Sequence, residues 1–219
     1  MNNARAISVS AEHVSSFVID EFGNLWSFGY SNFSQLGTGV GPGIHNTPAR
    51  VNYNDRMNNA RIRYVSAGGE HALAIDEFGN VWAWGNGRYG QIGDGAYGRR
   101  DRPVQVSGDG KFNGVRAVSV SAGSQASFAI DEKGRLWSWG QNSAGQLGDG
   151  TTTNRNTPMQ INTDGRMNNA RIDVISADGP TIAIDEFGNL WAWGSNWYGQ
   201  LGDGTTEGRS SPVQVIILN

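Results

Sequence analysis

The sequence predicts an all-β protein made of four copies of one strand-rich unit. Its 219 residues include 32 Gly, 8 Trp, 8 Phe and 6 Tyr. Glycine at roughly twice its average usage suits many tight turns, and the aromatic content argues against disorder. A repeat with a period of 54–56 residues covers the chain. Within each copy the apolar residues alternate with the period of a strand, and no window of 11 residues keeps a helical stripe.

The repeat is recognised by a tryptophan-containing pentapeptide that occurs four times. It stands at residues 25–29 (LWSFG), 81–85 (VWAWG), 136–140 (LWSWG) and 190–194 (LWAWG). An Ile-Asp-Glu segment precedes each pentapeptide, and a Gln-Leu-Gly or Gln-Ile-Gly segment follows it. We therefore expect one domain over residues 1–219, with repeats at 1–56, 57–111, 112–166 and 167–219.

The second copy illustrates the elements expected in every unit. Residues 62–67 and 71–75 are predicted strands separated by Gly68 and Gly69, and residues 76–80 are a hairpin loop in which Gly79 takes the left-handed conformation. Residues 81–84 form a third strand with both Trp on one face, and after a glycine-rich loop residues 104–106 form a short fourth strand. Four antiparallel strands in a unit of this size are typical of a β-propeller blade. We expect its Trp face to pack against the next blade.

At this point the sequence resembles a known family, that of the regulator-of-chromosome-condensation (RCC1-like) repeat. The matching segments are clearest in the second copy, at residues 67–71 (AGGEH), 84–85 (WG) and 90–93 (GQIG). The other copies depart from the pattern at residues 11–13, 123–125 and 178–180. The resemblance implies a propeller, which in this family usually closes with seven blades.

Four blades leave the closure of the ring open. Neighbouring blades turn by about 51° in a ring of seven, about 90° in a ring of four and about 45° in a ring of eight. The same Trp packing is not expected to serve at 90°, so two chains would complete an eight-bladed ring as a homodimer. The exposed end faces would bear Trp26 and Trp191, and the apolar residues 215–218 would reach the first blade of the other chain. The alternative is that the chain is a segment of a longer array.

Composition excludes several classes of function. The net charge of −3 and the pI of about 5.6 give no reason to expect nucleic acid or an acidic membrane as a partner. The absence of cysteine excludes thiol chemistry and cysteine-based metal sites. No apolar run is long enough to span a membrane, and the first residues lack the apolar segment of a signal peptide. We expect a soluble protein and leave its compartment open.

No motif predicts catalysis, a metal or a cofactor. Residues 85–90 fit G-x-G-x-x-G, but no helix follows them, so a turn is the expected structure. The Asp-Glu pair recurs in every copy, whereas an active site needs one convergent set, so these Asp residues are expected to bond the backbone of their hairpins. The Gly-Asp-Gly-Thr segments at 148–151 and 202–205 are also expected to be turns rather than calcium sites.

Two sets of loops vary from copy to copy while the strands repeat, which is how binding proteins are built. The candidate binding residues are Tyr30, Phe33, Arg88, Tyr89, Trp197, Tyr198, His13 and His71. The two histidines could instead satisfy hydrogen bonds at strand ends, and the aromatic residues could instead cover neighbouring blades. We expect a non-catalytic scaffold that binds another protein. The alternative is a lectin-like module for a carbohydrate or small ligand.

The resemblance also implies two more specific roles, which the residues do not favour. Nucleotide exchange in the family depends on an inserted wedge, but the four copies differ in length by only one or two residues. Guanine-nucleotide exchange is therefore the third interpretation. Ultraviolet sensing uses a Gly-Trp-Arg-His-Thr segment, and this sequence contains none.

Overall fold

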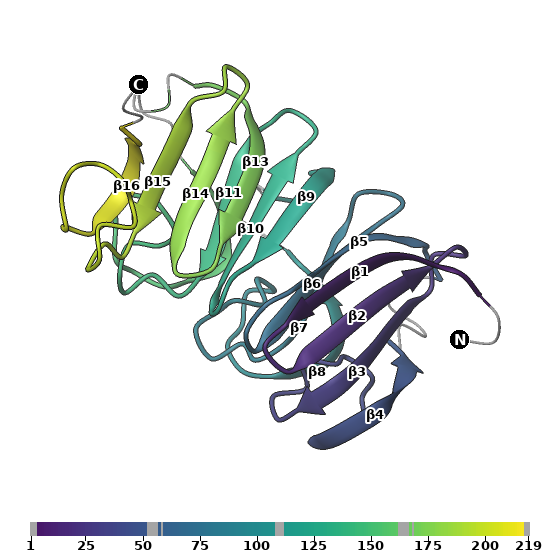
Figure 1. Ribbon diagram of the computed structural model, residues 1–219. Coiled ribbons are helices and arrows are strands. Elements are labelled where there is room, and N and C mark those ends of the chain that lie inside the picture. The colour runs from purple at the N-terminus through teal and green to yellow at the C-terminus, as the bar shows by residue number, and fades with distance from the viewer. Residues whose placement is uncertain are drawn as a thin grey trace.

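The computed structural model describes residues 4–51, 57, 59–107, 112–161, 167 and 169–216. Within these ranges the chain forms strands β1 to β16 and no helix (Figure 1). The strands build four antiparallel sheets of four strands each, in which sequential strands are neighbours. The predicted all-β class and the four-stranded units are confirmed.

Each sheet is one blade, and the blades follow one another in chain order. Blade 1 contains β1 (Ala6–Glu12), β2 (Ser15–Asp20), β3 (Leu25–Ser31) and β4 (Gly43–Arg50); blade 2 contains β5 (Ile62–Ala67), β6 (His71–Asp76), β7 (Val81–Gly85) and β8 (Arg100–Gln105); blade 3 contains β9 (Ala117–Ala122), β10 (Ala126–Asp131), β11 (Leu136–Gly140) and β12 (Arg155–Gln160); blade 4 contains β13 (Ile172–Ala177), β14 (Pro180–Asp185), β15 (Leu190–Gly194) and β16 (Arg209–Gln214).

The first strand of each blade lies on the inner side of the array. β5 contacts β1 and β9, and β9 also contacts β13. Two cross-blade hydrogen bonds support this line, because the Ser10 and Ser66 hydroxyls accept bonds from the backbone N–H groups of Ala67 and Ala122. The chain ends lie at opposite ends of the array (Figure 1). In the described residues no substantial contact joins the strands of blade 4 to those of blade 1, so the array is open.

The outermost strand differs from its prediction in extent. The expected strand at residues 104–106 is β8, which begins at Arg100 and ends at Gln105. Arg100 pairs with Gly85 and Gln105 pairs with Trp82, so the polar residues before Pro103 belong to the ladder. An edge strand tolerates charged residues and proline because one side of its backbone faces solvent. The missing apolar alternation concealed this part of the strand.

Three apolar clusters join the four blades, one at each seam between neighbours. The seam between blades 1 and 2 illustrates them: Phe17, Ile19 and Leu25 of blade 1 pack against Trp82 and Trp84 of blade 2. We call the Trp-bearing side of a blade its leading face and the opposite side its trailing face. The prediction that the Trp face packs against the next blade is therefore wrong in direction, because the leading face packs against the preceding blade.

The Gln-Leu-Gly segment of one blade receives the tryptophan of the next. The Nε1–H of Trp84 donates to the carbonyl of Gln35 at 2.8 Å, and the same bond joins Trp139 to Gln91 at 2.9 Å. A Cβ placed on Gly37 would lie 2.7 Å from the indole of Trp84. Glycine is required there because a side chain would occupy the space of the incoming ring.

The repeated Asp residues organise the hairpins, as predicted. The Oδ1 atom of Asp20 accepts bonds from the N–H groups of Phe22 and Asn24, and its Oδ2 atom accepts a bond from Trp26 Nε1–H at 2.9 Å. Burial alone would raise the pKa of Asp20, but the bonds from Trp26 and Asn24 outweigh it and lower the pKa below its usual value. Gly79 has φ of 86°, which confirms its left-handed conformation.

Two faces have no neighbouring blade in the described structure. On the leading face of blade 1, Val9 is 74% exposed, whereas Val65 at the equivalent position is 5% exposed. On the trailing face of blade 4, Ile184 is 38% exposed, whereas Ile75 is 4% exposed. Trp191, predicted on an exposed end face, is 6% exposed and packs in the seam with blade 3. That prediction is wrong because the Trp face points toward the preceding blade.

Some predictions fall on residues outside the described ranges. The repeat boundaries at 56, 111 and 166 do so, as do Ile217 and Leu218 of the apolar tail. The described part of that tail stays on its own blade, because Val215 N–H donates to Leu190 O and Ile216 N–H donates to Gly202 O, both at 2.9 Å. Because the structure holds no helix in its described residues, it holds none that is long and apolar enough to cross a membrane.

Candidate functional site

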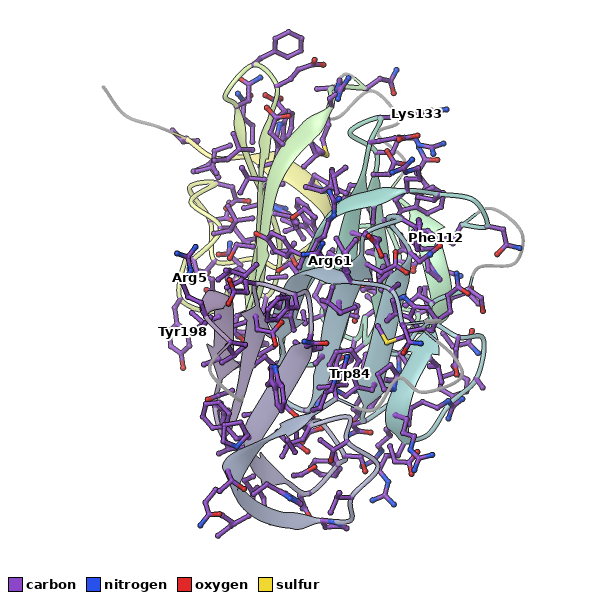
Figure 2. All side chains as sticks on the ribbon, turned by 90° about the vertical axis from the view of Figure 1, so that its right-hand side faces the viewer. Arg5, Arg61, Trp84, Phe112, Lys133 and Tyr198 are labelled. Atoms are coloured by element: carbon purple, nitrogen blue, oxygen red, sulfur yellow. The ribbon has the colours of Figure 1, made fainter. Side chains whose placement is uncertain are left out.

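The antiparallel topology places both variable loop sets at one end of the blades. Loops between the first and second strands and loops between the third and fourth strands leave the sheets at the same end, and the Asp-Glu hairpins leave at the other. We call these two ends the loop face and the hairpin face. Figure 2 shows Lys133 of the hairpin face at the surface of the molecule. Trp84 lies inside the molecule in the same view.

All four blades contribute to one cavity at the loop face. Its volume is about 360 Å³, and its lining includes Glu12, His13, Val14, Tyr30, Asn32, Phe33, Gln35, Gly69, Glu70, Ser124 and Asp178. Blade 1 supplies one wall through two of its loops, and blades 2, 3 and 4 supply the loops that join their first two strands. The variable loops therefore converge, which the repeated strands and hairpins do not.

Three predicted site residues line this cavity. Tyr30 is 41% exposed at the end of β3, and Phe33 is half-buried in the following loop. His13 has φ of 52°, in the left-handed region, and its Nδ1 atom lies 3.6 Å from Glu12 Oε1. These residues come from both loops of blade 1, which explains how residues 17 or more positions apart share one wall.

The other predicted aromatic residues lie on the loop face but do not line the cavity. Trp197 is 82% exposed and Tyr198 is 93% exposed, both in the second loop of blade 4, and Tyr198 projects from the surface in Figure 2. In the matching loop of blade 2 the guanidinium carbon of Arg88 lies 5.5 Å from the centre of the Tyr89 ring. Trp197 and Tyr198 do not cover a neighbouring blade.

His71 is not available to a partner, so its prediction as a binding residue is corrected. The residue is fully buried at the start of β6, and its Nε2 atom lies 2.8 Å from the Ser127 hydroxyl of blade 3. Burial lowers the pKa of His71 to about 4. The strand register aligns His71 with Ser15 rather than with His13, because Ser15 pairs with Gly29 and His71 pairs with the equivalent Gly85. The Nε2 bond of His71 crosses the seam to blade 3 instead of closing the end of its own strand, and its buried Nδ1 atom has no hydrogen-bond partner in the described structure.

The acidic residues of the cavity were missed by the sequence analysis. Glu12, Glu70 and Asp178 come from blades 1, 2 and 4. They stand in the first variable loop, where three of the four copies carry an acid. That recurrence was the available signal, but their convergence depends on blade curvature, which the sequence does not state. No Lys or Arg lines the cavity.

The Gly-Asp-Gly-Thr segments form turns, as predicted. Asp203 Oδ1 accepts bonds from the N–H and the hydroxyl of Thr205, and Asp203 Oδ2 accepts a 2.7 Å bond from Arg209. These bonds, led by that of the Thr205 hydroxyl, lower the pKa of Asp203 to about 2. Among the residues that the structure describes, no group of three or more His, Asp or Glu could hold a metal ion.

Each of the three seams repeats one contact, in which a tryptophan N–H donates to the Gln carbonyl of the preceding blade. The family model described as the RCC1-like domain matches residues 1–219. The chain belongs to the RCC1-like domain family. The E3 ubiquitin-protein ligase HERC2 of Homo sapiens is 36% identical over 147 residues, which are 66% of this chain and 3% of that protein.

Two solved structures share the fold of this RCC1-like domain. Human WBSCR16 superposes with a TM-score of 0.82 at 24% identity, covering 96% of this chain and 52% of that chain. Prp20p of Saccharomyces cerevisiae superposes with a TM-score of 0.79 at 21% identity, covering 100% of this chain and 52% of that chain. The chain thus spans about half the length of these structures and a small part of HERC2.

Proposed function

We propose that this RCC1-like domain is a non-catalytic scaffold that binds another protein through its loop face. The observation that supports the proposal most is the convergence of variable loops from all four blades on one cavity that Tyr30 and Phe33 line, with Trp197 and Tyr198 exposed elsewhere on the loop face. Tyr and Trp are enriched among the residues that dominate protein interfaces. In such a protein the repeated strands maintain the fold, and the loops that differ from copy to copy form the binding surface.

A member of the same fold supports a protein as the partner. Prp20p of Saccharomyces cerevisiae has binding properties to Gsp1p and histones. The identity of 21% shows a shared fold only, so the partner of this chain is not inferred to be either of these proteins. Protein binding as the class of function is the part we carry over.

The proposal is tested by affinity capture with two matched triple variants. Tyr30→Ser, Trp197→Ser and Tyr198→Ser remove three exposed aromatic side chains from the loop face. Phe22→Ser, Phe78→Ser and Phe187→Ser remove three from the hairpin face, where these residues are 63%, 61% and 74% exposed. We expect the loop-face variant to lose the captured protein and the hairpin-face variant to retain it.

The other interpretations predict different outcomes. If the loop-face variant retains the captured protein and the hairpin-face variant loses it, the binding surface lies on the hairpin face and our proposal is wrong. Binding to a glycan array that the loop-face variant loses, without any captured protein, would favour the lectin-like alternative. Accelerated nucleotide release from a captured GTP-binding protein would favour the exchange-factor alternative.

We also propose that a second copy of this chain covers the two open faces. The leading face of blade 1 carries Val9, Trp26 and Phe28, and Phe28 stands where blades 2, 3 and 4 have a buried Trp. The trailing face of blade 4 carries Ile184 and the glycine segment that ends at Gly202. These faces are apolar like the two sides of each internal seam, so a second chain can repeat the apolar packing at both ends, without the hydrogen bond that Trp84 donates to Gln35.

Light scattering tests this assembly. A chain of 23.5 kDa gives about 47 kDa as a pair, and we expect Val9→Asp to shift the mass to the monomer because it places a charge in an apolar seam. Val118→Asp is the matched control, since Val118 is 57% exposed on the inner strand of blade 3 rather than on an open face. A wild-type monomer at micromolar concentration contradicts the assembly but leaves binding at the loop face unaffected.

A further inference from the structure

The cavity at the loop face is lined by acidic side chains that no Lys or Arg in the lining neutralises. Glu12, Glu70 and Asp178 line it from three different blades. Side chains of Glu and Asp are anionic at neutral pH, and the lining contains no Lys or Arg to neutralise them. The lining contains one histidine, His13, which lies beside Glu12.

These carboxylates are not part of the structural pairs that recur in the blades. The Asp residues of the hairpins and of the Gly-Asp-Gly-Thr turns bond a Trp, a Thr or an Arg of their own blade. Glu70 instead accepts a 2.6 Å bond from the Asn86 side chain, which holds its carboxylate at the cavity. Asp178 takes no part in the ion pairs described for this structure.

The walls of the cavity add a second, independent preference. Tyr30 and Phe33 both line it, and apolar atoms make up most of the surface that its lining residues expose. The face of an aromatic ring attracts a cation that lies within about 6 Å of its centre. Aromatic walls do not ligate metal ions in the way that oxygen-rich sites do, so the combination with carboxylates favours an organic cation over a metal.

Size selects the form of that cation. The volume of about 360 Å³ lies near the lower end of the range of roughly 300–1,000 Å³ for ligand cavities. A cavity of this size takes one long side chain rather than a folded element. A guanidinium group stacks on aromatic rings and bonds carboxylates through a planar set of donors, which a Lys ammonium cannot do.

We propose that the cavity binds a cationic side chain of the partner protein, with the guanidinium of an arginine as the group that fits it best. Tyr30 and Phe33 contact the guanidinium and its aliphatic stem, and Glu70 and Asp178 bind its charge. This inference rests on the proposed function, because it names the chemistry by which the loop face would recognise a protein.

The test uses the amides of acetyl-arginine and acetyl-citrulline, which have similar shapes but differ in charge. Each is titrated into the 15N-labelled chain and followed by two-dimensional NMR. We expect arginine to shift the backbone amides of residues 12–14, 30–35 and 69–70, and citrulline to bind at least fivefold more weakly. Raising the salt concentration should weaken arginine binding and leave citrulline binding unchanged.

Two variants assign the effect to the cavity. Glu70→Gln and Asp178→Asn should each weaken arginine binding about two- to fivefold, the range expected for an ion pair that is partly exposed. Glu132→Gln makes the same change of charge on the hairpin face, where Glu132 faces Arg116 at 3.9 Å, and should leave binding unchanged. The dispersion of the NMR spectrum verifies that each variant is folded.

The outcomes separate this inference from the proposed function. Equal binding of arginine and citrulline, or shifts confined to other loops, would overturn the cationic preference. If the loop-face triple variant still loses its captured protein in that case, the protein-binding function stands without the preference. If arginine binds selectively but no protein is captured, the cation site stands and the protein-binding function fails.

Discussion

Substitution of Gly93 by alanine should destabilise the protein by more than its backbone conformation alone predicts. Gly93 has φ of 77° and belongs to the segment that receives Trp139 of the next blade. A Cβ at this position would lie 2.6 Å from Trp139 Nε1, which is too close for any real contact. Trp139 is fully buried and donates a hydrogen bond to Gln91 O, so the ring has little freedom to move.

Gly95 provides the matched control. It has φ of 84° in the same loop, and a Cβ there would meet nothing closer than Thr157 Cγ2 at 3.9 Å. Both glycine N–H groups donate to a backbone carbonyl, and alanine keeps both bonds. Gly95→Ala should therefore cost about 1–2 kcal/mol of unfolding free energy, for the left-handed conformation alone.

Gly93→Ala carries the same backbone cost and a packing cost in addition. Forcing a methyl group into a filled seam costs about 1–3 kcal/mol, so the total is about 2–5 kcal/mol. Urea unfolding followed by Trp fluorescence, at one protein concentration for all variants, measures the difference. If the two variants unfold within about 0.5 kcal/mol of each other, Gly93 serves only the turn, and the account of the seam is wrong.

Three further measurements test other parts of the structure. Val65→Ala should cost about 2–3 kcal/mol of unfolding free energy because Val65 is buried in a seam. Val9→Ala at the equivalent position should change the unfolding free energy of the monomer by less than about 0.5 kcal/mol. Equal effects of the two variants would contradict an open face on blade 1. Burial lowers the pKa of His71 from 6.5 to about 4, so between these pH values the unfolded chain binds a proton on this residue that the folded chain does not bind. The free energy of unfolding should therefore fall by roughly 3 kcal/mol as the pH drops from 6.5 to 4. His71→Asn should remove that slope in urea titrations. Asp131→Asn should cost about 1–3 kcal/mol of unfolding free energy, since it weakens the bonds from Trp137 and Arg135. In the wild type the stabilisation by the Asp131 carboxylate is fully present above pH 3.8, and urea titrations should show its loss as the pH falls through the lowered pKa of Asp131.

The repeated residues made the strands and hairpins predictable from the sequence. Trp82, Asp76 and Gly79 recur in equivalent form in every copy, and each takes part in a local contact: Trp82 donates to Asp76, Asp76 accepts from the backbone of its hairpin, and Gly79 takes the left-handed conformation. Local chemistry of this kind depends on neighbours in sequence, so composition and spacing reveal it.

The direction of the seams could not be predicted in the same way. The pattern shows that Trp82 and Trp84 share a face, but either neighbouring blade could cover that face. The twist and order of the strands decide that blade 1 does so, and the sequence does not state this. The misplacement of Trp191 on an open face follows from that one error.

The candidate site was predicted in part. The variable loops identified Tyr30, Phe33, Trp197 and Tyr198 as surface residues outside the repeat. His71 was included because it follows Glu70 as His13 follows Glu12 in the first copy, but strand pairing shows that the two histidines stand two positions apart in the repeat. The acidic lining depends on how far the blades curve, and that curvature brings Asp178 to the same cavity as Glu12.

All described seams have the same direction along the chain, and this has a consequence for how such arrays change in length. Every seam joins a Trp-bearing face to a glycine-bearing face in the same order. If one whole repeat is removed from the middle, the two flanking repeats still meet as complementary faces, and no compensating substitution is needed. Duplication of a repeat has the same property, because stability in such arrays is close to a sum over units and nearest neighbours. The number of units can thus change in a single genetic step, whereas removal of part of a repeat leaves an apolar face that no neighbour matches.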